Sequence, residues 1–339
     1  MEKARKRIEY IDILKGFAII TVVFLHVHSG YDVEETPAGY LIRYFRSFQM
    51  SMFFVLSGIL FNPSINNYKD KIVGKIKTLF LPSVLWGGII GIGLESVRKY
   101  LGTEGIYNYN LKSEIVGFIL GKSSFYGSWF VFTLFGVYLL EYLISFICKR
   151  TNFPYKSILI TIIHILFAVC GLLIGKYDFS LYYNFRFVLV ASMLFYAGYL
   201  YQQFNKRHYT AIDILSVIVG IVLSMVNTGV VVFSDFYFAN PIISVLASFC
   251  TIYGLIGIAE KLSEKFNFRF LKLMGQNSII VLYTHFILIL VVIRMLEKLL
   301  KLPIHTFPAI LSFIIIIALE FVLVKYMPSC FKKLFGINK

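Results

Sequence analysis

The residue types best suited to chemistry lie in the first long apolar segment of the chain, residues 9–29. This segment contains Lys15 and His26, eleven positions apart. In an α-helix, which turns about 100° and rises about 1.5 Å per residue, this spacing leaves the two side chains about 20° apart around the axis and about 16 Å apart along it. A cation and an imidazole at different depths on one helix face suit a tunnel with an anion-binding mouth and an internal proton acceptor.

Each of these residues also has a purely structural interpretation. A single histidine near a helix end commonly serves as a hydrogen-bonded structural group. The long side chain of Lys15 can extend from an apolar helix to the membrane interface. Asp12 precedes Lys15 by three residues, the spacing at which opposite charges pair across one turn, so it is either part of a site or only the counter-ion of the lysine.

The composition of the chain is that of an integral membrane protein. Of its 339 residues, 58% are hydrophobic and 15% are charged, which leaves too little polar surface to cover a water-soluble globule of this size. Crossing a bilayer takes roughly 20 apolar residues in a helix, and segments of this kind recur from end to end. We therefore expect an all-α, polytopic helical bundle in contact with the lipid bilayer, forming one transmembrane domain over residues 1–339.

The apolar runs predict about ten transmembrane helices. We place them near residues 9–29, 41–61, 78–97, 128–147, 157–175, 186–204, 211–232, 237–259, 276–297 and 307–327. The longest break between them contains an apolar patch, residues 114–120, that is too short to cross and is expected to lie at the outer interface or to re-enter. No internal repeat is visible, which disfavours the common inverted-repeat plan of transporters.

Basic residues are concentrated in alternate breaks of this pattern. The formal net charge is +15, and an excess of Lys and Arg marks cytoplasmic loops. All the basic breaks fall on one side if both termini are cytoplasmic, which agrees with an even number of spans. Because membrane topology explains the excess of basic residues, we do not expect a nucleic-acid partner. The four cysteines are far apart in the chain and predict neither a metal site nor a disulfide framework.

The segment that carries the first candidates resembles the opening helix of acyltransferase family 3, a family of polytopic membrane enzymes. The family signature there is a basic residue, ten intervening residues and a histidine, and Lys15 and His26 occupy these places in YIDILKGFAIITVVFLH. Three further segments are similar to the family and occur in its order: FQMSMFFVLSGIL (48–60), GSWFVFTLF (127–135) and MGQNSIIVLYTHFIL (274–288). Together the four segments are a specific signal over about the first 290 residues.

The resemblance implies an enzyme that moves an acyl group, usually acetyl, from cytoplasmic acyl-coenzyme A to a sugar hydroxyl of an extracytoplasmic or lipid-linked glycan. Acyl-coenzyme A would be a co-substrate, not a permanently bound cofactor, and the enzyme would lie in a bacterial inner or plasma membrane. A basic mouth that includes Lys15 would hold the polyanionic nucleotide while the thioester arm reaches into the tunnel. His26 would then act as a general base or as a transient acyl carrier, two roles that the sequence leaves open.

A second group of cations precedes the proline that opens the third span. The family often has two arginines three residues apart at this point, and this chain has Lys75 and Thr78 at those places before Pro82, with Lys77 alongside. Lysine keeps the positive field but lacks the bidentate hydrogen bonds that arginine makes with phosphate. We assign Lys75 and Lys77 to the mouth for coenzyme A, with a plain cytoplasmic-loop signal as the alternative.

Several further residues have a packing interpretation beside a functional one. His285 is a second catalytic candidate, which would orient the first histidine or bind the thioester carbonyl, and Tyr283 is an orienting candidate in the same YTH string. Ser57 is small enough to admit either the thioester arm or a neighbouring helix. Arg46 and Trp129 are the candidates for binding the acceptor sugar, although Trp129 also fits an interfacial anchor.

A transporter or flippase for a glycan or lipid-linked sugar is the rival function. In that case Asp12, Lys15, His26 and His285 would form a proton or substrate path through the bundle. Release of free thiol from acetyl-coenzyme A separates the two functions, because only the acyltransferase breaks the thioester. Two other acidic residues within spans, Glu141 and Glu320, are expected to face the interior of the bundle and a partner there.

Overall fold

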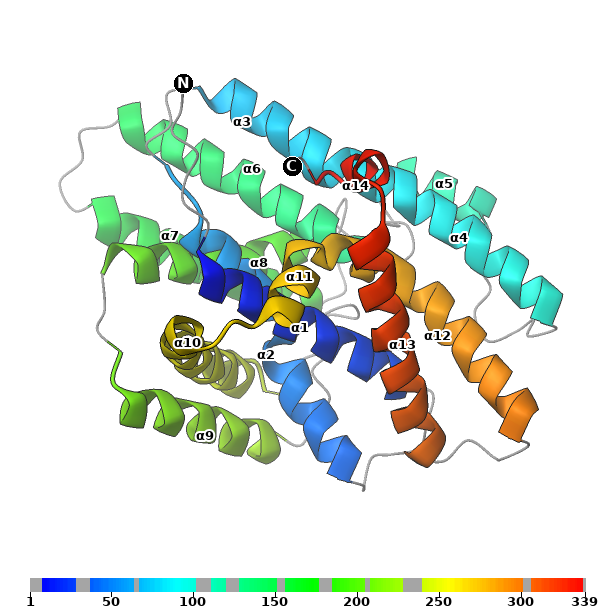
Figure 1. The fold of residues 1–339 in the computed structure, drawn as a ribbon. Helices are drawn as coiled ribbons and strands as arrows, with labels where there is room; N and C mark the ends of the chain where they lie inside the picture. The colour runs from blue at the N-terminus through cyan, green and yellow to red at the C-terminus, as the bar shows by residue number, and fades with distance from the viewer. Residues whose placement is uncertain are drawn as a thin grey trace.

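The fold is built from helices throughout the part of the chain that the computed structural model describes. That part comprises residues 8–28, 37–63, 67–101, 111–119, 128–150, 156–176, 185–204, 208–227, 240–300 and 306–337, and it contains no β-strand. The helices, shown in Figure 1, are α1 (Glu9–His28), α2 (Pro37–Ile59), α3 (Tyr68–Lys75), the π-helical turn η1 (Ile76–Phe80), α4 (Leu81–Leu101), α5 (Leu111–Ile119), α6 (Trp129–Arg150), α7 (Lys156–Lys176), α8 (Phe185–Gln203), α9 (Thr210–Val226), α10 (Pro241–Lys265), α11 (Arg269–Gln276), α12 (Ser278–Leu300), α13 (Thr306–Tyr326) and α14 (Ser329–Leu334). The predicted all-α class is confirmed.

Seven helical segments in the described residues are long and apolar enough to cross a membrane. They are α1, the continuous helix formed by α3, η1 and α4, then α6, α7, α10, α12 and α13. Helix α9 is apolar but only 17 residues long. The protein is thus a multi-pass membrane protein, while the count of ten spans and the cytoplasmic placement of both termini stay predictions.

Helix ends differ from the predicted span ends where polar residues extend a helix beyond its apolar stretch. The lysine-rich residues before the third span were expected in a break, but they belong to the helix that starts at Tyr68. The predicted span 237–259 begins instead at Pro241, because Asn240 caps the helix by accepting hydrogen bonds from the backbone N–H groups of Ile242 and Ile243. Hydropathy marks the apolar length of a helix and not its ends.

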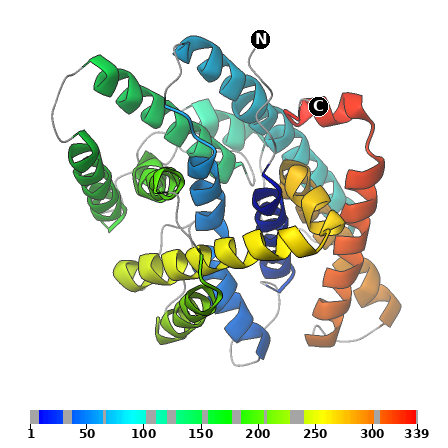
Figure 2. The same cartoon turned by 60° about the vertical axis from the view of Figure 1, so that its left-hand side comes forward.

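Helix α1 lies at the centre of the bundle and makes contact with α2, α10, α11, α12 and α13 (Figures 1 and 2). In its most apolar stretch 67% of the residues are buried, against 17% in α7. Because both helices are strongly apolar, this difference identifies α1 as a core helix and α7 as a helix with a face free for lipid. The helix that carries Lys15 and His26 is therefore surrounded by other helices.

Two glycines bring α1 and α11 into backbone contact. A Cβ atom at Gly16 would lie 2.0 Å from the carbonyl oxygen of Leu271, and one at Gly275 would lie 1.9 Å from that of Asp12. No larger residue fits at either position without separating the helices. The contact places Gln276, the last residue of α11, beside the start of α1.

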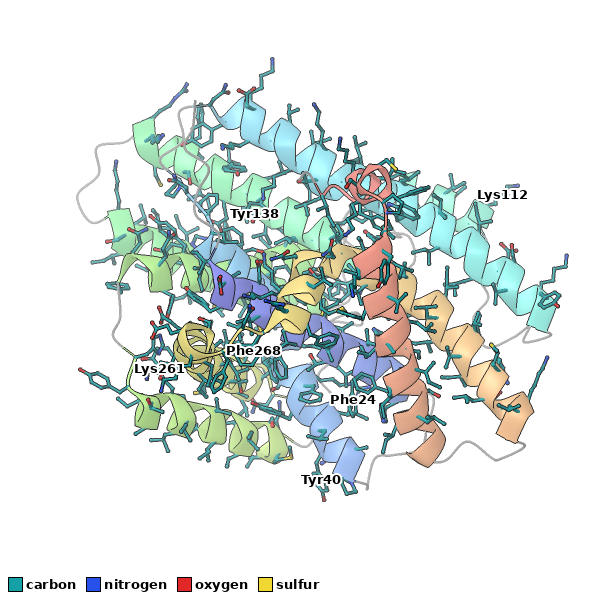
Figure 3. All side chains as sticks on the ribbon, viewed as in Figure 1. Phe24, Tyr40, Lys112, Tyr138, Lys261 and Phe268 are labelled. Atoms are coloured by element: carbon teal, nitrogen blue, oxygen red, sulfur yellow. The ribbon has the colours of Figure 1, made fainter. Side chains whose placement is uncertain are left out.

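Individual side chains tie further helices to this core (Figure 3). The ring of Phe24 in α1 lies 5.4 Å from the ring of Phe45 in α2 and 5.3 Å from that of Phe313 in α13, measured between centroids. At the other side of the bundle the fully buried Asp213 of α9 accepts a hydrogen bond from Lys261 of α10 at 3.0 Å. Aromatic packing thus ties α1 to α2 and α13, and a partly buried ion pair ties α9 to α10.

Candidate active site

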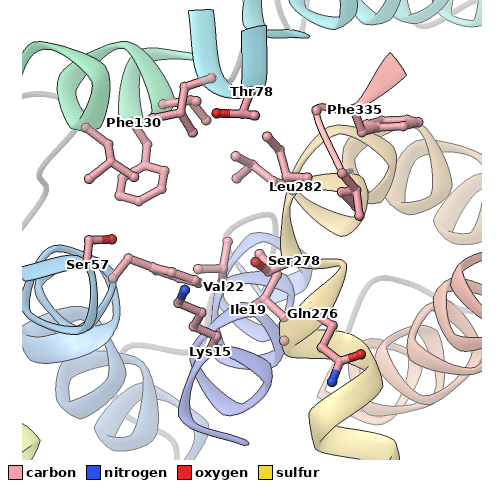
Figure 4. A pocket seen from close by; sticks show the side chains of 18 of the residues that line it. Lys15, Ile19, Val22, Ser57, Thr78, Phe130, Gln276, Ser278, Leu282 and Phe335 are labelled. Atoms are coloured by element: carbon pink, nitrogen blue, oxygen red, sulfur yellow. The ribbon is translucent and has the colours of Figure 1, made fainter. Parts of the chain in front are cut away.

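A cavity of about 300 Å³ lies along one face of α1 (Figure 4). Lys15, Ile19 and Val22 line it from α1, and these positions share one helix face. Helix α2, turn η1, α6, the junction of α11 with α12, and the residues that follow α14 supply the other walls. The face that carries the predicted lysine is therefore the face that borders an internal space.

The cavity has a polar end around Lys15. The lysine side chain is half-buried and points into the cavity, as Figure 4 shows. Asp12, also in the lining, is buried and accepts a hydrogen bond of 3.0 Å from Nε2 of Gln276. Thr78 and Ser278 add hydroxyl groups to the wall. Lys15, Asp12 and Gln276 thus form a polar end of an otherwise largely apolar space, and Thr78 lies across the cavity from Lys15.

The rest of the cavity lining is mostly apolar. Met50, Phe53, Phe130 and Leu134 contribute to it from α2 and α6. Ser57 lines the cavity too, whereas its neighbour Gly58 faces α8, where an added Cβ would lie 1.8 Å from the carbonyl oxygen of Phe195. The close helix contact at this point is therefore made by the glycine, and the small serine leaves room in the cavity.

His26 occupies the next position on the Lys15 face, one turn beyond Val22. Its side chain is exposed although Leu25 and Val27 beside it are buried and the residue lies deep within the protein. His26 is not among the lining residues of the cavity and lies one turn beyond its last lining residue on α1. Arg46 of α2 lies near enough for its positive charge to act on the imidazole, so the structure brings these two predicted residues together.

His285 lies beside His26. The centroids of the two imidazole rings are 5.3 Å apart, and Ile279 and Leu282 on the preceding turns of α12 line the cavity. Nδ1 of His285 lies 2.8 Å from the carbonyl oxygen of Val281. Because a carbonyl only accepts, Nδ1 must carry the proton, and in the neutral ring Nε2 then carries the lone pair.

The paired state of Nε2, the lone-pair nitrogen of His285, bears on its function. The side chain is fully buried, and Nε2 has no hydrogen-bond partner among the described residues. Buried polar groups are nearly always paired in native proteins, and exceptions often mark functional positions. A hydrogen-bond donor of a substrate at this point would satisfy Nε2. Two histidines from α1 and α12 thus form a polar pair at the end of the two cavity-lining faces.

Hydrogen bonds from α12 fix the position of this pair. The hydroxyl of Tyr283 donates to Oγ of Ser83 at 2.9 Å, and Oγ of Ser128 donates to the carbonyl oxygen of Ser83 at 3.1 Å. The first bond joins α12 to α4, and the second joins α4 to the residue before α6. They fit the orienting role predicted for Tyr283, two residues before His285.

The two buried acidic residues predicted to have partners do have them. Nε2 of His164 lies 2.8 Å from Oε1 of Glu141, which joins α7 to α6. The hydroxyl of Thr284 lies 2.8 Å from both carboxylate oxygens of the fully buried Glu320, which joins α12 to α13 next to His285. Neither carboxylate lines the cavity along α1.

The remaining predicted site residues lie around the cavity and not in its lining. The ammonium group of Lys75 lies 3.5 Å from the ring centroid of Tyr138, whose hydroxyl hydrogen-bonds to the lining residue Ser57. Lys77 is exposed. Trp129 is half-buried and its ring packs 5.6 Å from that of Phe187. The structure thus places Lys75 at the flank of the cavity and gives Trp129 a packing contact.

Thr78, Gln276 and the residues after α14 line the cavity but were not predicted as lining residues. A π-helical turn changes the register of a helix and is frequent at functional sites, and η1 places Thr78 in the wall. A weak signal for Thr78 existed in its position before Pro82. Gln276 lies in the family-like segment 274–288, but that segment gave no indication of a contact with the cavity. For the residues after α14 the sequence carried no signal, because they reach the cavity through tertiary contacts.

The fold and the site define a class of protein. It is a multi-pass membrane protein whose central helix carries a lysine in an internal cavity and, further along the same face, a histidine paired with a second histidine. The chain matches the family model of the acyltransferase domain over residues 8–324. It belongs to acyltransferase family 3 and is a membrane acyltransferase. No match was found among curated proteins or among solved structures.

Proposed function

We propose that this membrane acyltransferase is an O-acyltransferase of a bacterial inner or plasma membrane. It takes an acyl group, most simply acetyl, from cytoplasmic acyl-coenzyme A and transfers it to a sugar hydroxyl of an extracytoplasmic or lipid-linked glycan. The observation that carries the proposal is the cavity along the Lys15 face of α1, with His26 on the same face beyond it and His285 beside that histidine.

The shape and charge of the cavity suit the thioester arm of coenzyme A. That arm is thin and ends in the acyl thioester, while the nucleotide at its other end carries phosphate charges. The ammonium group of Lys15 at the polar end attracts those charges, and Lys75 and Lys77 add positive charge on the neighbouring helix. The rise of α1 between Lys15 and His26, about 16 Å, matches a donor that binds in extended form.

His26 supplies the proton acceptor for the transfer. The acceptor oxygen attacks the carbonyl carbon of the thioester while its hydroxyl proton passes to the imidazole of His26. The carbon–sulfur bond then breaks, and the proton passes from the imidazolium to the departing thiolate, which leaves as free coenzyme A. The charge of Arg46, which acts at this position, stabilises negative charge that develops on the carbonyl oxygen.

The other site residues have supporting roles in this scheme. Nε2 of His285 accepts a hydrogen bond from the acceptor or from His26 and so orients the reacting groups. Arg46 is also the best-placed of the predicted acceptor-binding residues, since it is half-buried near His26. Trp129 remains a weaker proposal, because its ring is engaged with Phe187. An acetylated His26 as an intermediate is the alternative route, which rapid quenching and peptide mass spectrometry can detect.

The test is the reaction of the purified, detergent-solubilised protein with acetyl-coenzyme A that carries a labelled acetyl group. Free thiol is followed with a chromogenic reagent, and labelled acetyl on a panel of glycan acceptors is followed by mass spectrometry. We expect thiol release that depends on an acceptor and equals the acetyl incorporated. A protein that leaves the thioester intact with every acceptor but moves a lipid-linked sugar across proteoliposomes would instead be a flippase.

A further inference from the structure

The residues that follow α14, Phe335–Ile337, lie against the cavity although the sequence places them outside every apolar span. All three line the cavity along α1. They also lie beyond residues 8–324, which match the family model. The family match therefore does not cover this C-terminal segment.

An aromatic contact holds the segment in place. The ring of Phe335 is 1% exposed and stacks on the indole of Trp86 with centroids 4.0 Å apart and planes inclined by 8°. The indole Nε1–H donates a hydrogen bond of 3.0 Å to the carbonyl oxygen of Leu334. A fully buried aromatic ring with a polar tie beside it is a strong anchor, so the segment is part of the folded bundle.

The end of α14 directs the chain toward the cavity. The N–H of Ile337 bonds to the carbonyl oxygen of Lys332 at 3.1 Å, and the N–H of Gly336 bonds to that of Lys333 at 2.9 Å. This pair of bonds, with Gly336 at φ +76°, is a Schellman motif, in which glycine adopts the left-handed conformation that ends a helix. The turn is therefore determined by residues 332–337 themselves.

Gly336 also packs closely against the wall of the cavity. A Cβ atom at this position would lie 2.4 Å from the carbonyl oxygen of Thr78 in η1. The backbone of the segment therefore presses directly on the turn that carries a lining hydroxyl. Figure 4 shows Phe335 beside Leu282 on the side of the cavity opposite Ser57.

We propose that Phe335–Ile337 form a wall of the acyl-donor site and determine how tightly the donor binds. This inference rests on the proposed function, because it assigns the polar end of the cavity to acyl-coenzyme A. The segment borders the part of the cavity that contains Thr78 and lies across from Lys15. Its loss would open the donor cavity and leave the His26 and His285 pair at the other end in place.

Two truncations and one matched pair of glycine variants test the proposal. One truncation ends after Leu334 and removes the wall, whereas the control ends after Ile337 and removes only two residues. Gly336→Ala forces a Cβ onto Thr78, whereas its control Gly74→Ala places a Cβ where nothing lies within 4 Å. Correct insertion and folding of each are checked by size-exclusion chromatography.

The readouts are the KM for acetyl-coenzyme A, the KM for the acceptor, and the thermal shift that coenzyme A induces without turnover. We expect the truncation after Leu334 to raise the KM for the donor at least about tenfold and to abolish the thermal shift, with Gly336→Ala intermediate. The KM for the acceptor should change less than about twofold, since that substrate meets the other end of the site. Both controls should behave as the full chain.

The outcomes separate this inference from the proposed function. If the truncation after Leu334 binds coenzyme A as tightly as the full chain, the proposed wall is wrong and the proposed acyltransferase function is unaffected. If the full chain binds coenzyme A but never releases thiol, the proposed function is wrong. The thermal shifts of the variants then still show whether Phe335–Ile337 contribute to coenzyme A binding. If the truncation fails to fold, the comparison of Gly336→Ala with Gly74→Ala decides it.

Discussion

At the scale of single residues, the site depends on which groups are accessible and which are held. His26 is exposed within a buried helix, and His285 is buried with Nδ1 bonded to Val281. The imidazole of His26 thus presents accessible surface, whereas the imidazole of His285 is fixed in a single tautomer by its bond to Val281. Lys15 is half-buried at the polar end of the cavity, where the proposed function has it hold the opposite end of the donor.

The role of Lys15 leads to a prediction about donor affinity. Lys15→Ala should raise the KM for acetyl-coenzyme A by about tenfold, because a phosphate contact at the mouth is lost, and should leave the KM for the acceptor unchanged. Steady-state kinetics on the purified variant measure both values. Lys298→Ala is the matched control, since Lys298 is exposed near the far end of α12.

A smaller effect is expected when Lys75 and Lys77 are both replaced by alanine. Unchanged donor affinity in this variant would assign those two lysines to membrane topology alone. Unchanged affinity in Lys15→Ala as well would remove the cationic mouth from the mechanism.

At the scale of elements, close approach of α1 and α11 positions the polar end of the cavity. Helix α11 has only eight residues, too few to be stable alone, so its place depends on contact with α1. Gly16 and Gly275 allow that contact and bring Gln276 to Asp12. The short helix thereby supplies one wall of the site.

Gly275→Ala should therefore destabilise the protein. The added Cβ would meet the backbone of Asp12 at 1.9 Å, and overpacking of this kind typically costs about 1–3 kcal/mol. Gly88→Ala is the control, because a Cβ there meets nothing within 4 Å. Thermal unfolding in detergent, followed by the loss of the monodisperse peak, should show a lower midpoint for the first variant only. Equal midpoints would mean that the two helices can separate freely.

The elements also show what the sequence could and could not predict. Every predicted span range overlaps a helix, because a bilayer-crossing helix needs a long apolar stretch that is visible in one sequence. The lysine-rich helix from Tyr68 was missed, since polar residues continue a helix into water without any hydropathy signal. The shared face of Lys15 and His26 was predictable because helical geometry is local.

Other parts of the site depend on contacts between distant segments. Gln276 is 264 positions from Asp12, and Trp86 is 248 positions from Leu334. No periodicity records such pairs, so neither the carboxylate–amide contact nor the C-terminal wall could be derived from the sequence. The proximity of His285 to His26 was anticipated only through the resemblance of the YTH segment to the family.

At the scale of the whole molecule, the distribution of charge predicts the orientation in the membrane. Lys and Arg lie mainly in alternate breaks, which places both termini and the polar end of the cavity on the cytoplasmic side. This orientation is what a cytoplasmic donor requires, because acyl-coenzyme A does not cross the bilayer unaided.

Cysteine accessibility tests the orientation in cells. A cysteine introduced at Lys149 or Lys206 should resist a thiol reagent that cannot cross the membrane and should react after permeabilisation. The four native cysteines are first replaced by serine or alanine, and activity confirms that this background is folded. Labelling of either position in intact cells would reverse the orientation and place the donor cavity on the wrong side.

The central claim, that the face of α1 beyond the cavity carries out acyl transfer, is tested most directly at His26. The measurement is acceptor-dependent thiol release from acetyl-coenzyme A by the full chain, His26→Ala, His26→Gln and His285→Ala, each normalised to inserted protein. We predict that His26→Ala keeps the donor-induced thermal shift but loses at least about 10² in rate, with His26→Gln nearly as slow and His285→Ala milder. Near-normal thiol release by His26→Ala would contradict the account, because the proton acceptor would then lie elsewhere.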